Sequence, residues 1–162
     1  MQRSGSTPIG ARTTTTPGGK VHAKKDLDAI VAAHNPSYLA TACAAYPQDL
    51  FKKVQKALTL RGSKFIHVLA PCPPGWRFSS EMTVEMGKLA VRSGLWILYE
   101  SEFGKVTING PSKAAMIKPI PIEDYLSVQG RFKGIDRKAI DALKSQAEQR
   151  AKHLQKEAEG IC

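Results

Sequence analysis

Cys72 is the residue of this chain whose type and surroundings are best suited to chemistry. It follows an apolar run at 65–69 that is typical of a buried strand, and Pro71, Pro73 and Pro74 flank it. Because proline fixes φ and has no N–H to donate, these residues predict a stiff, non-helical loop at the end of the strand. Ligands bind at such strand ends in open α/β sheets. We therefore interpret Cys72 as a candidate functional thiol, with a loop cysteine of no function as the alternative.

The chain lacks the short motifs that carry self-contained catalysis. It has no GxxxxGKS/T, no GxGxxG after a strand, no HExxH and no GxSxG. His67 alternates with apolar residues in the predicted strand, so we interpret it as a structural histidine. A Cys72–His67 dyad is disfavoured because Cys72 lies beyond the strand. No catalytic residue is therefore assigned.

The first residues offer donors for an anion. Segment 2–8 reads Gln-Arg-Ser-Gly-Ser-Thr-Pro and combines a guanidinium with hydroxyl and backbone N–H groups. The glycines, prolines and four threonines at 13–16 otherwise predict an irregular, flexible tail over residues 1–24. On the residues alone, both interpretations stay open.

Alternating helices and strands are expected after this tail. The predicted helices lie at 25–34 and from Pro47 to about residue 60, and the predicted strands lie at 38–43 and 64–70. This order implies an α/β fold with right-handed crossovers and a parallel sheet covered on both faces. The buried stripe of the second helix is expected to consist of Leu50, Phe51, Val54 and Leu58.

The second half of the chain changes in character. A helix, two strands around a turn and a short helical segment are expected at 79–93, 95–109 and 122–129. Prolines predict an extended arm over residues 111–122. Residues 136–159 predict a long amphipathic helix, whose narrow, alanine-rich stripe suits contact with a partner better than a place in a core.

Composition limits the class of protein. The chain has 162 residues, enough for one domain with a sizeable core. No apolar run approaches the ~20 residues of a membrane span, and the N-terminus lacks the apolar region of a signal peptide, so we expect a cytoplasmic protein. The three cysteines, Cys43, Cys72 and Cys162, include no CxxC pair, which argues against a disulfide framework or a complete metal site.

The net charge of +10 permits a nucleic-acid surface. However, the basic residues are spread along the chain, and the aromatic residues, 7% of the total, do not alternate with them. The alternatives to nucleic-acid binding are a surface that docks on acidic partners and a basic face that is only solvated. Nucleic-acid binding is the less favoured interpretation.

Several segments, in one order along the chain, together resemble a known family. They are QRSGSTPIGA with the threonine-rich run after it, KKD, YLATA, HVLAPCPPGW and LAVRSGLW, at 2–18, 24–26, 38–42, 67–76 and 89–96. They resemble the C-terminal half of the beta subunit of 2-oxoacid:ferredoxin oxidoreductases, most of all the pyruvate type (pyruvate synthase). PIPIEDYL at 119–126 and QGRF at 129–132 fit the same tail, so the resemblance covers essentially the whole chain.

The resemblance implies a fold, an activity and cofactors. The fold would be half of a thiamine-diphosphate-binding domain over residues 1–110, then an arm and long helix over 111–162 for subunit contact. The activity would be oxidative decarboxylation of a 2-oxoacid to an acyl-coenzyme A, with electrons passing through iron–sulfur clusters to ferredoxin. The cofactors would be thiamine diphosphate, Mg²⁺ and a 4Fe–4S cluster, and the partners would be the other subunits, ferredoxin, the 2-oxoacid and coenzyme A.

The same resemblance implies roles for four residues. Cys72 matches the family's last cluster-ligating cysteine, which would have to present its thiolate at fixed geometry, away from bulk water. Gln2, Arg3 and Ser4 follow the family's metal-binding loop and are implied to lie against the cofactor. Cys43 and Cys162 match no ligand position.

The match also has a gap. The family's other three cluster cysteines, its GDG motif and the loop that holds Mg²⁺ lie upstream of the matching region. We therefore expect a truncated or split gene product, or a fragment, that binds neither the cofactor nor a complete cluster alone. The alternative function is a non-catalytic basic module, for nucleic acid or a protein partner, that retains half of the fold.

Overall fold

A four-stranded mixed sheet forms the centre of the computed structural model, which describes residues 4–160. The strands are β1 (Tyr38–Cys43), β2 (Lys64–Leu69), β3 (Tyr99–Glu102) and β4 (Lys105–Ile108), in the order β2-β1-β3-β4. β1 and β2 run parallel as predicted, but β3 is antiparallel to both β1 and β4. The prediction of a wholly parallel sheet was therefore wrong.

A tight turn explains the antiparallel half of the sheet. Phe103 and Gly104 alone connect β3 to β4, and both have positive φ, 46° and 83°. Two such residues form the kind of turn that matches the twist of an antiparallel hairpin, whereas parallel strands need a crossover of a dozen or more residues. β3 also begins later than predicted: at Leu98 the backbone N–H bonds to the side-chain oxygen of Ser112 (2.7 Å) instead of to a strand.

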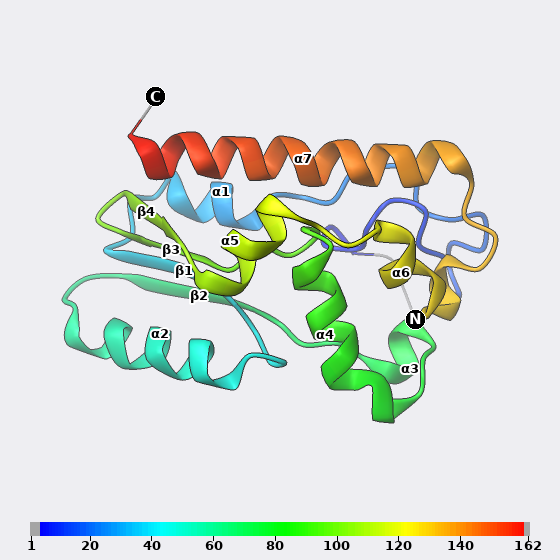
Figure 1. Ribbon diagram of the computed structural model, residues 1–162, viewed down its shortest axis with the longest axis horizontal. Coiled ribbons are helices and arrows are strands. Elements are labelled where there is room, and N and C mark those ends of the chain that lie inside the picture. The colour runs from blue at the N-terminus through cyan, green and yellow to red at the C-terminus, as the bar shows by residue number, and fades with distance from the viewer. Residues whose placement is uncertain (1–3, 161–162) are drawn as a thin grey trace.

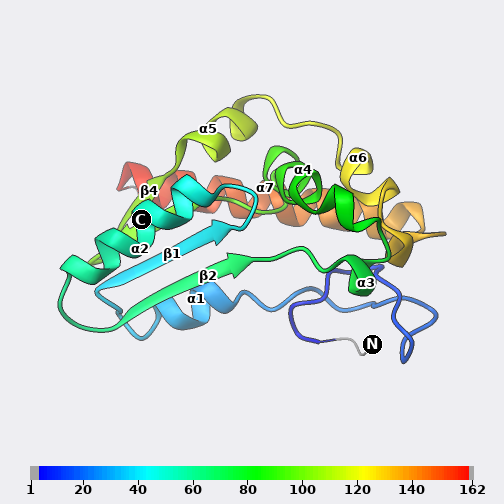
Figure 2. The ribbon, with the colours of Figure 1, turned by 90° about the horizontal axis from the view of Figure 1, so that it is seen from below.

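Helices cover both faces of the sheet (Figures 1 and 2). α1 (Leu27–Ala32) and α7 (Arg137–Glu159) lie on one face, and α2 (Pro47–Thr59) lies on the other. The remaining helices, most of which lie beyond the carboxyl ends of β1 and β2, are accompanied by two 3₁₀ turns. They are α3 (Pro73–Trp76), α4 (Thr83–Arg92), α5 (Gly110–Ile117) and α6 (Ile122–Ser127), with the turns at Ser80–Met82 and Gly130–Phe132.

α5 corrects the prediction of an extended arm over residues 111–122. Pro111 stands in the first turn of this helix, where its missing N–H costs nothing. The carbonyl of Asn109 accepts bonds from the N–H groups of Ser112 and Lys113, both at 3.0 Å. Only residues 118–121 connect α5 to α6 without helix or strand.

α7 packs on the sheet of its own chain. Asp136 caps its first turn, because the Asp136 side chain accepts a bond from the N–H of Ala139 (2.7 Å). Leu143 and Leu154 on its inner face are buried. The expectation that this stripe suits a partner better than a core was therefore wrong for these leucines. Neither α7 nor any other helix within residues 4–160 is long and apolar enough to cross a membrane. The division of the chain into domains at residue 110 stays a prediction.

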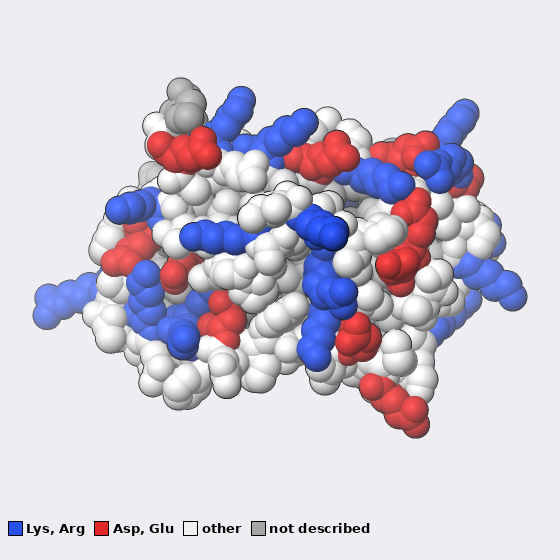
Figure 3. All heavy atoms as spheres, viewed as in Figure 1, with Lys and Arg blue, Asp and Glu red and all other residues white. Residues whose placement is uncertain are grey.

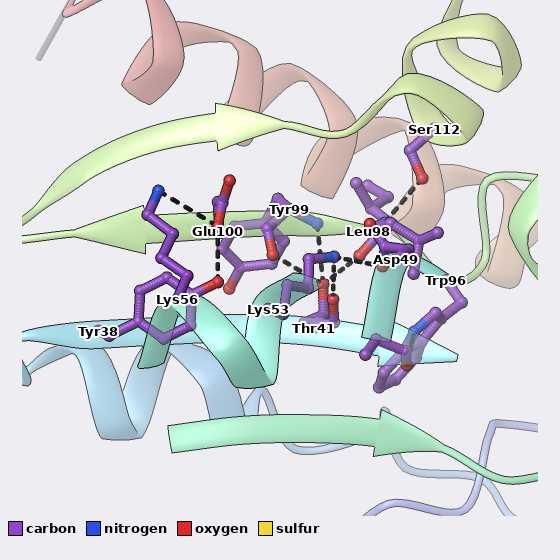
Figure 4. Close-up of polar contacts among 12 residues, drawn as sticks. Tyr38, Thr41, Asp49, Lys53, Lys56, Trp96, Leu98, Tyr99, Glu100 and Ser112 are labelled. Carbon is purple, nitrogen blue, oxygen red and sulfur yellow. Dashed lines mark hydrogen bonds and ion pairs between the residues drawn. The ribbon is translucent and has the colours of Figure 1, made fainter. Parts of the chain in front are cut away.

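A buried lysine sets the orientation of α2 (Figure 4). Lys53 is 2% exposed, and its ammonium donates to the carbonyl of Thr41 (2.6 Å) and to Asp49 Oδ2 (2.7 Å). The hydroxyl of Thr41 in turn donates to the carbonyl of Ile97 (2.6 Å) and accepts from the N–H of Tyr99 (3.0 Å). This network joins α2 to β1 and to residues 97–99 at the start of β3.

With Lys53 buried, α2 leaves its apolar stripe exposed to solvent. Lys53 and Ala57 are its buried positions, while Phe51 is 61% exposed and Leu58 79% exposed, with Val54 between them also exposed. The predicted buried stripe was therefore wrong for these three residues. One residue further along a helix is about 100° around its axis, so the stripe is displaced from the buried face by about that angle.

Candidate functional site

Cys72 lies just beyond β2 and directly before α3. Its backbone is extended (φ −110°, ψ 100°), and its carbonyl accepts a bond from the N–H of Trp76 at 2.8 Å. Pro73 and Pro74 fill the first turn of α3, where helices tolerate proline. Cys72 itself is non-helical, as predicted, but a short helix begins at the next residue, which was not predicted. The thiol is free and exposed, so residues 4–160 do not provide the shielding from water that a cluster ligand is expected to have.

The turn Gly130–Phe132 packs against α3. The N–H of Gly130 donates to the carbonyl of Arg77 at 3.0 Å, and the guanidinium of Arg131 lies 3.9 Å from the ring centre of Trp76. Arg131 is only 6% exposed. The turn Gly130–Phe132, which comes much later in the sequence, therefore holds the segment that carries Cys72.

His67 is engaged on the face of β2 that α1 covers. Its Nδ1 lies 2.7 Å from Oδ1 of Asp28, and its ring meets the Trp96 ring edge-on at a centroid distance of 4.8 Å. The ammonium of Lys24 lies 4.6 Å from the centre of the same indole. The prediction of a structural histidine is confirmed by these contacts.

A cavity of about 610 Å³ brings distant parts of the chain together. Ser4 and Lys24 line it from the N-terminal segment, His67 lines it from β2, and Trp76 and Arg131 line it from the α3 region. Ser4, a predicted cofactor-binding residue, thus shares a cavity with the turn that follows Cys72. Gln2 and Arg3, the other two, lie outside the described residues.

The N-terminal segment is irregular, as predicted, but it is anchored by a buried lysine. The ammonium of Lys20 donates to the carbonyls of Ser4 (3.1 Å), Gly5 (3.3 Å) and Thr7 (2.5 Å). Lys20 is itself buried. Because these carbonyls converge on one cation, residues 4–7 form a fixed loop beside the cavity, which corrects the interpretation as a flexible tail.

Lys20→Met is expected to release this loop. The substitution keeps the apolar stem but leaves three carbonyls without their charged donor, at a cost of about 1–3 kcal/mol. Hydrogen exchange of the amides at 5–11 is expected to rise, whereas Lys52→Met on the exposed side of α2 leaves it unchanged. Equal exchange in the two variants would contradict the anchoring role.

The donors for a metal centre are incomplete in the described chain. Residues 4–160 contain no group of three or more His, Cys, Asp or Glu side chains placed to hold a metal ion. Cys43 is buried, and burial raises the pKa of its thiol. Iron–sulfur clusters of this type take four thiolates. Within residues 4–160, Cys72 is the exposed cysteine, and a single thiol does not complete a site of this kind.

Charges of both signs share the face of the molecule shown in Figure 3. Lysines and arginines lie among acidic residues over much of this face, and the described chain contains ion pairs between the two kinds. Lys56 lies 2.7 Å from Glu102, and Lys144 lies 2.7 Å from Glu123. Residues of both signs are thus mixed on this face, with one group of adjacent Lys and Arg side chains near its centre (Figure 3).

Comparison with known proteins identifies relatives. No family model matches the sequence. The chain is 43% identical over 164 residues to the ketoisovalerate oxidoreductase subunit VorB of Pyrococcus horikoshii. The aligned region covers 98% of the chain and 52% of that relative. It is 43% identical over 159 residues to the pyruvate synthase subunit PorB of Methanocaldococcus jannaschii (95% and 52%) and 41% identical over 163 residues to that of Thermotoga maritima (94% and 49%).

The chain is homologous to the beta subunits of 2-oxoacid:ferredoxin oxidoreductases. This confirms the resemblance inferred from the sequence segments. The chain spans about half the length of the beta subunits it matches. Beta subunits named for ketoisovalerate and for pyruvate are equally similar to it, at 43%, so overall identity does not separate the two 2-oxoacids.

Proposed function

We propose that this chain is the C-terminal portion of a 2-oxoacid:ferredoxin oxidoreductase beta subunit, with part of a thiamine-diphosphate-binding fold. Together with the rest of that subunit and its partner subunits, it would take part in the oxidative decarboxylation of a 2-oxoacid to an acyl-coenzyme A, with ferredoxin as electron acceptor. The observation that carries this proposal is 43% identity over 98% of the chain.

The unpaired edge of β2 supports the proposal, because a strand from the rest of the subunit could pair with it. β2 pairs with β1 on one side and is one of the two edge strands of the sheet within residues 4–160. It carries one charged residue, Lys64, and no proline, and Val68 is 40% exposed. Edge strands without protecting charges, prolines or bulges are usually covered, and parallel strands are usually buried. An adjoining strand would satisfy both tendencies.

The residues of this chain would have two tasks in the assembled enzyme. Cys72 would supply one thiolate of a 4Fe–4S cluster, and the segment from Gln2 to Ser4 would lie against thiamine diphosphate and its Mg²⁺. When bound, these groups supply the carbon and electron-transfer chemistry, and the protein positions them. Lys20 would hold the loop at Ser4, and α3 would hold Cys72.

The isolated chain is expected to show no saturable binding of thiamine diphosphate with Mg²⁺, and no oxidation of 2-oxoacids. The physical reason is that residues 4–160 contain no cluster of metal-binding side chains. Isothermal titration calorimetry of the 162-residue chain measures this directly. Binding is expected to appear when the chain is combined with a polypeptide that supplies the unmatched half of a beta subunit.

Two results would count against the proposal. One is micromolar cofactor binding by the chain alone, which would mean that the metal site does not need the half of a beta subunit that this chain does not match. The other is tight binding of a labelled duplex or single strand, measured by fluorescence anisotropy, with a steep dependence on salt. That outcome would favour the non-catalytic basic module.

A further inference from the structure

The exposed apolar stripe of α2 lies on the flank of the helix that faces the unpaired edge of β2. Lys56 identifies the opposite flank, because its ammonium lies 2.7 Å from a carboxylate oxygen of Glu102 and 3.5 Å from one of Glu100 (Figure 4). Both glutamates belong to β3, and β1 separates β3 from β2. Successive residues of an α-helix are about 100° apart around its axis, so the stripe lies about 140–160° from Lys56. The stripe consists of Phe51, Val54 and Leu58.

β2 presents exposed apolar surface on the same face and at the same edge. Val68 is 40% exposed, and it alternates with Ile66 along the strand, so the two side chains point to the same face of the sheet. Ile66 packs against a buried cluster that contains Ala57 of α2, which makes this the face that α2 covers. We call the stripe of α2 and Val68 together the edge surface.

The exposed charges around the edge surface are all positive. Between residues 47 and 64 the exposed charged residues are Lys52, Arg61 and Lys64. None of the ion pairs within residues 4–160 includes them. The one carboxylate in this range, that of Asp49, is paired with the buried Lys53. A surface that complements this one is therefore apolar at its centre and acidic at its rim.

These charges argue against a second copy of this chain as the specific occupant. A symmetric pair would place one basic rim against the other, and like charges that meet at an interface are unfavourable. The length of the relatives points to a different occupant. The aligned region covers 52% of the VorB and PorB subunits, so about half of such a subunit lies outside the match. Helices usually cover both faces of parallel strands, so a strand from that half that paired with β2 would need a helix over it.

We propose that the edge surface is the docking site for a helix from the half of a beta subunit that this chain does not match. The helix lies beside α2 on the same face of the sheet, with apolar side chains against the stripe and carboxylates near Arg61 and Lys64. This inference rests on the proposed function, which makes that half the partner of this chain. It adds that α2 makes the contact together with the strand edge of β2.

The test is co-expression of the full chain with a tagged polypeptide, the half of the Methanocaldococcus jannaschii PorB subunit that the chain does not match. The amount of chain recovered per tagged half is measured by quantitative mass spectrometry. Leu58→Glu is expected to reduce the recovery at least about tenfold, because it would bury a carboxylate at the centre of the contact.

Two controls separate docking from folding. Leu58 is 79% exposed, so Leu58→Glu is expected to leave the melting temperature of the isolated chain unchanged. Ile117→Glu makes the same kind of change at a residue that is 86% exposed at the end of α5, and it is expected to leave the recovery unchanged.

A second variant tests the basic rim. Arg61→Glu reverses a charge that would face a carboxylate of the partner, so it is expected to reduce the recovery at low salt and to have less effect at high salt. Lys138→Glu, at an exposed lysine of α7, is the matched control and is expected to leave the recovery unchanged. Equal recovery of these two variants overturns the acidic rim of the partner helix.

The failures of the two proposals are distinguishable. No recovery of the wild-type chain with the tagged half overturns the proposed assembly of the subunit and, with it, the docking of a helix. Recovery of the wild type together with equal recovery of Leu58→Glu and Ile117→Glu overturns the docking on α2 alone. A dimer of the isolated chain that Leu58→Glu converts to a monomer, and that the tagged half does not displace, also overturns it and assigns the edge surface to a second copy.

Discussion

Under the proposed function, Cys72→Ser is expected to remove or convert the iron–sulfur cluster that this residue would help to bind in the assembled enzyme. A serine hydroxyl is a hard and poorly ionised ligand, whereas these clusters are held by thiolates. Electron transfer to ferredoxin is expected to be largely lost, with decarboxylation of the 2-oxoacid surviving better. Iron analysis and EPR of the reconstituted enzyme measure the loss, and separate assays for carbon dioxide release and ferredoxin reduction measure the split.

Cys43→Ser is the matched control, since it makes the same substitution at a cysteine that matches no ligand position. Cys43 is fully buried on β1 and packs in the main hydrophobic core. We expect the cluster to be retained and the free energy of unfolding to fall by about 1–3 kcal/mol, because a hydroxyl enters an apolar site. A full cluster in the Cys72 variant, or loss of the cluster in the Cys43 variant alone, would show that the wrong cysteine was assigned.

Lys53→Met is expected to cost about 3–5 kcal/mol of stability, the largest effect foreseen for the fold itself. Methionine keeps the length of the stem but leaves Asp49 without its buried partner and the carbonyl of Thr41 without its donor. Urea unfolding followed by circular dichroism, with the slope checked for constancy, gives the change in free energy.

The neighbouring Lys52 provides a control in the same helix. It is exposed, so Lys52→Met is expected to change the stability by less than about 0.5 kcal/mol. The double variant Lys53→Met with Asp49→Asn is expected to recover part of the loss, because no unpaired carboxylate is then left. Equal stability of the Lys52 and Lys53 variants would mean that the buried ammonium does not support the fold.

Much of the secondary structure could be predicted because strong local patterns carry it. The apolar runs of β1 and β2 and the helical period of α7 specify their elements without knowledge of the fold. The direction of β3 could not be predicted in this way, because it depends on which edge of β1 is free and on the turn at Phe103–Gly104. The sequence does not reveal α5, because Pro111 is typical of a helix breaker, although a proline in a first turn is compatible with a helix.

The candidate site was predicted in part. The prolines around Cys72 mark it in the sequence, and a lysine after the glycine pair Gly18–Gly19 is a weak signal that Lys20 has a special environment. No local pattern distinguishes Arg131 or Lys53 from the many solvated basic residues of a chain with a net charge of +10. Their burial comes from tertiary contacts with Trp76 and Thr41, and for this reason the apolar stripe of α2 was also assigned to the wrong face.

The exposed stripe on α2 has a consequence for the supply of this protein in a cell. Phe51 and Leu58 present apolar surface to water on the helix that packs over β1 and β2, and β2 offers an unpaired strand edge. Surfaces of this kind promote self-association when the chain is made in excess. Synthesis of this chain no faster than it is assembled with the elements that cover these surfaces would therefore limit its self-association.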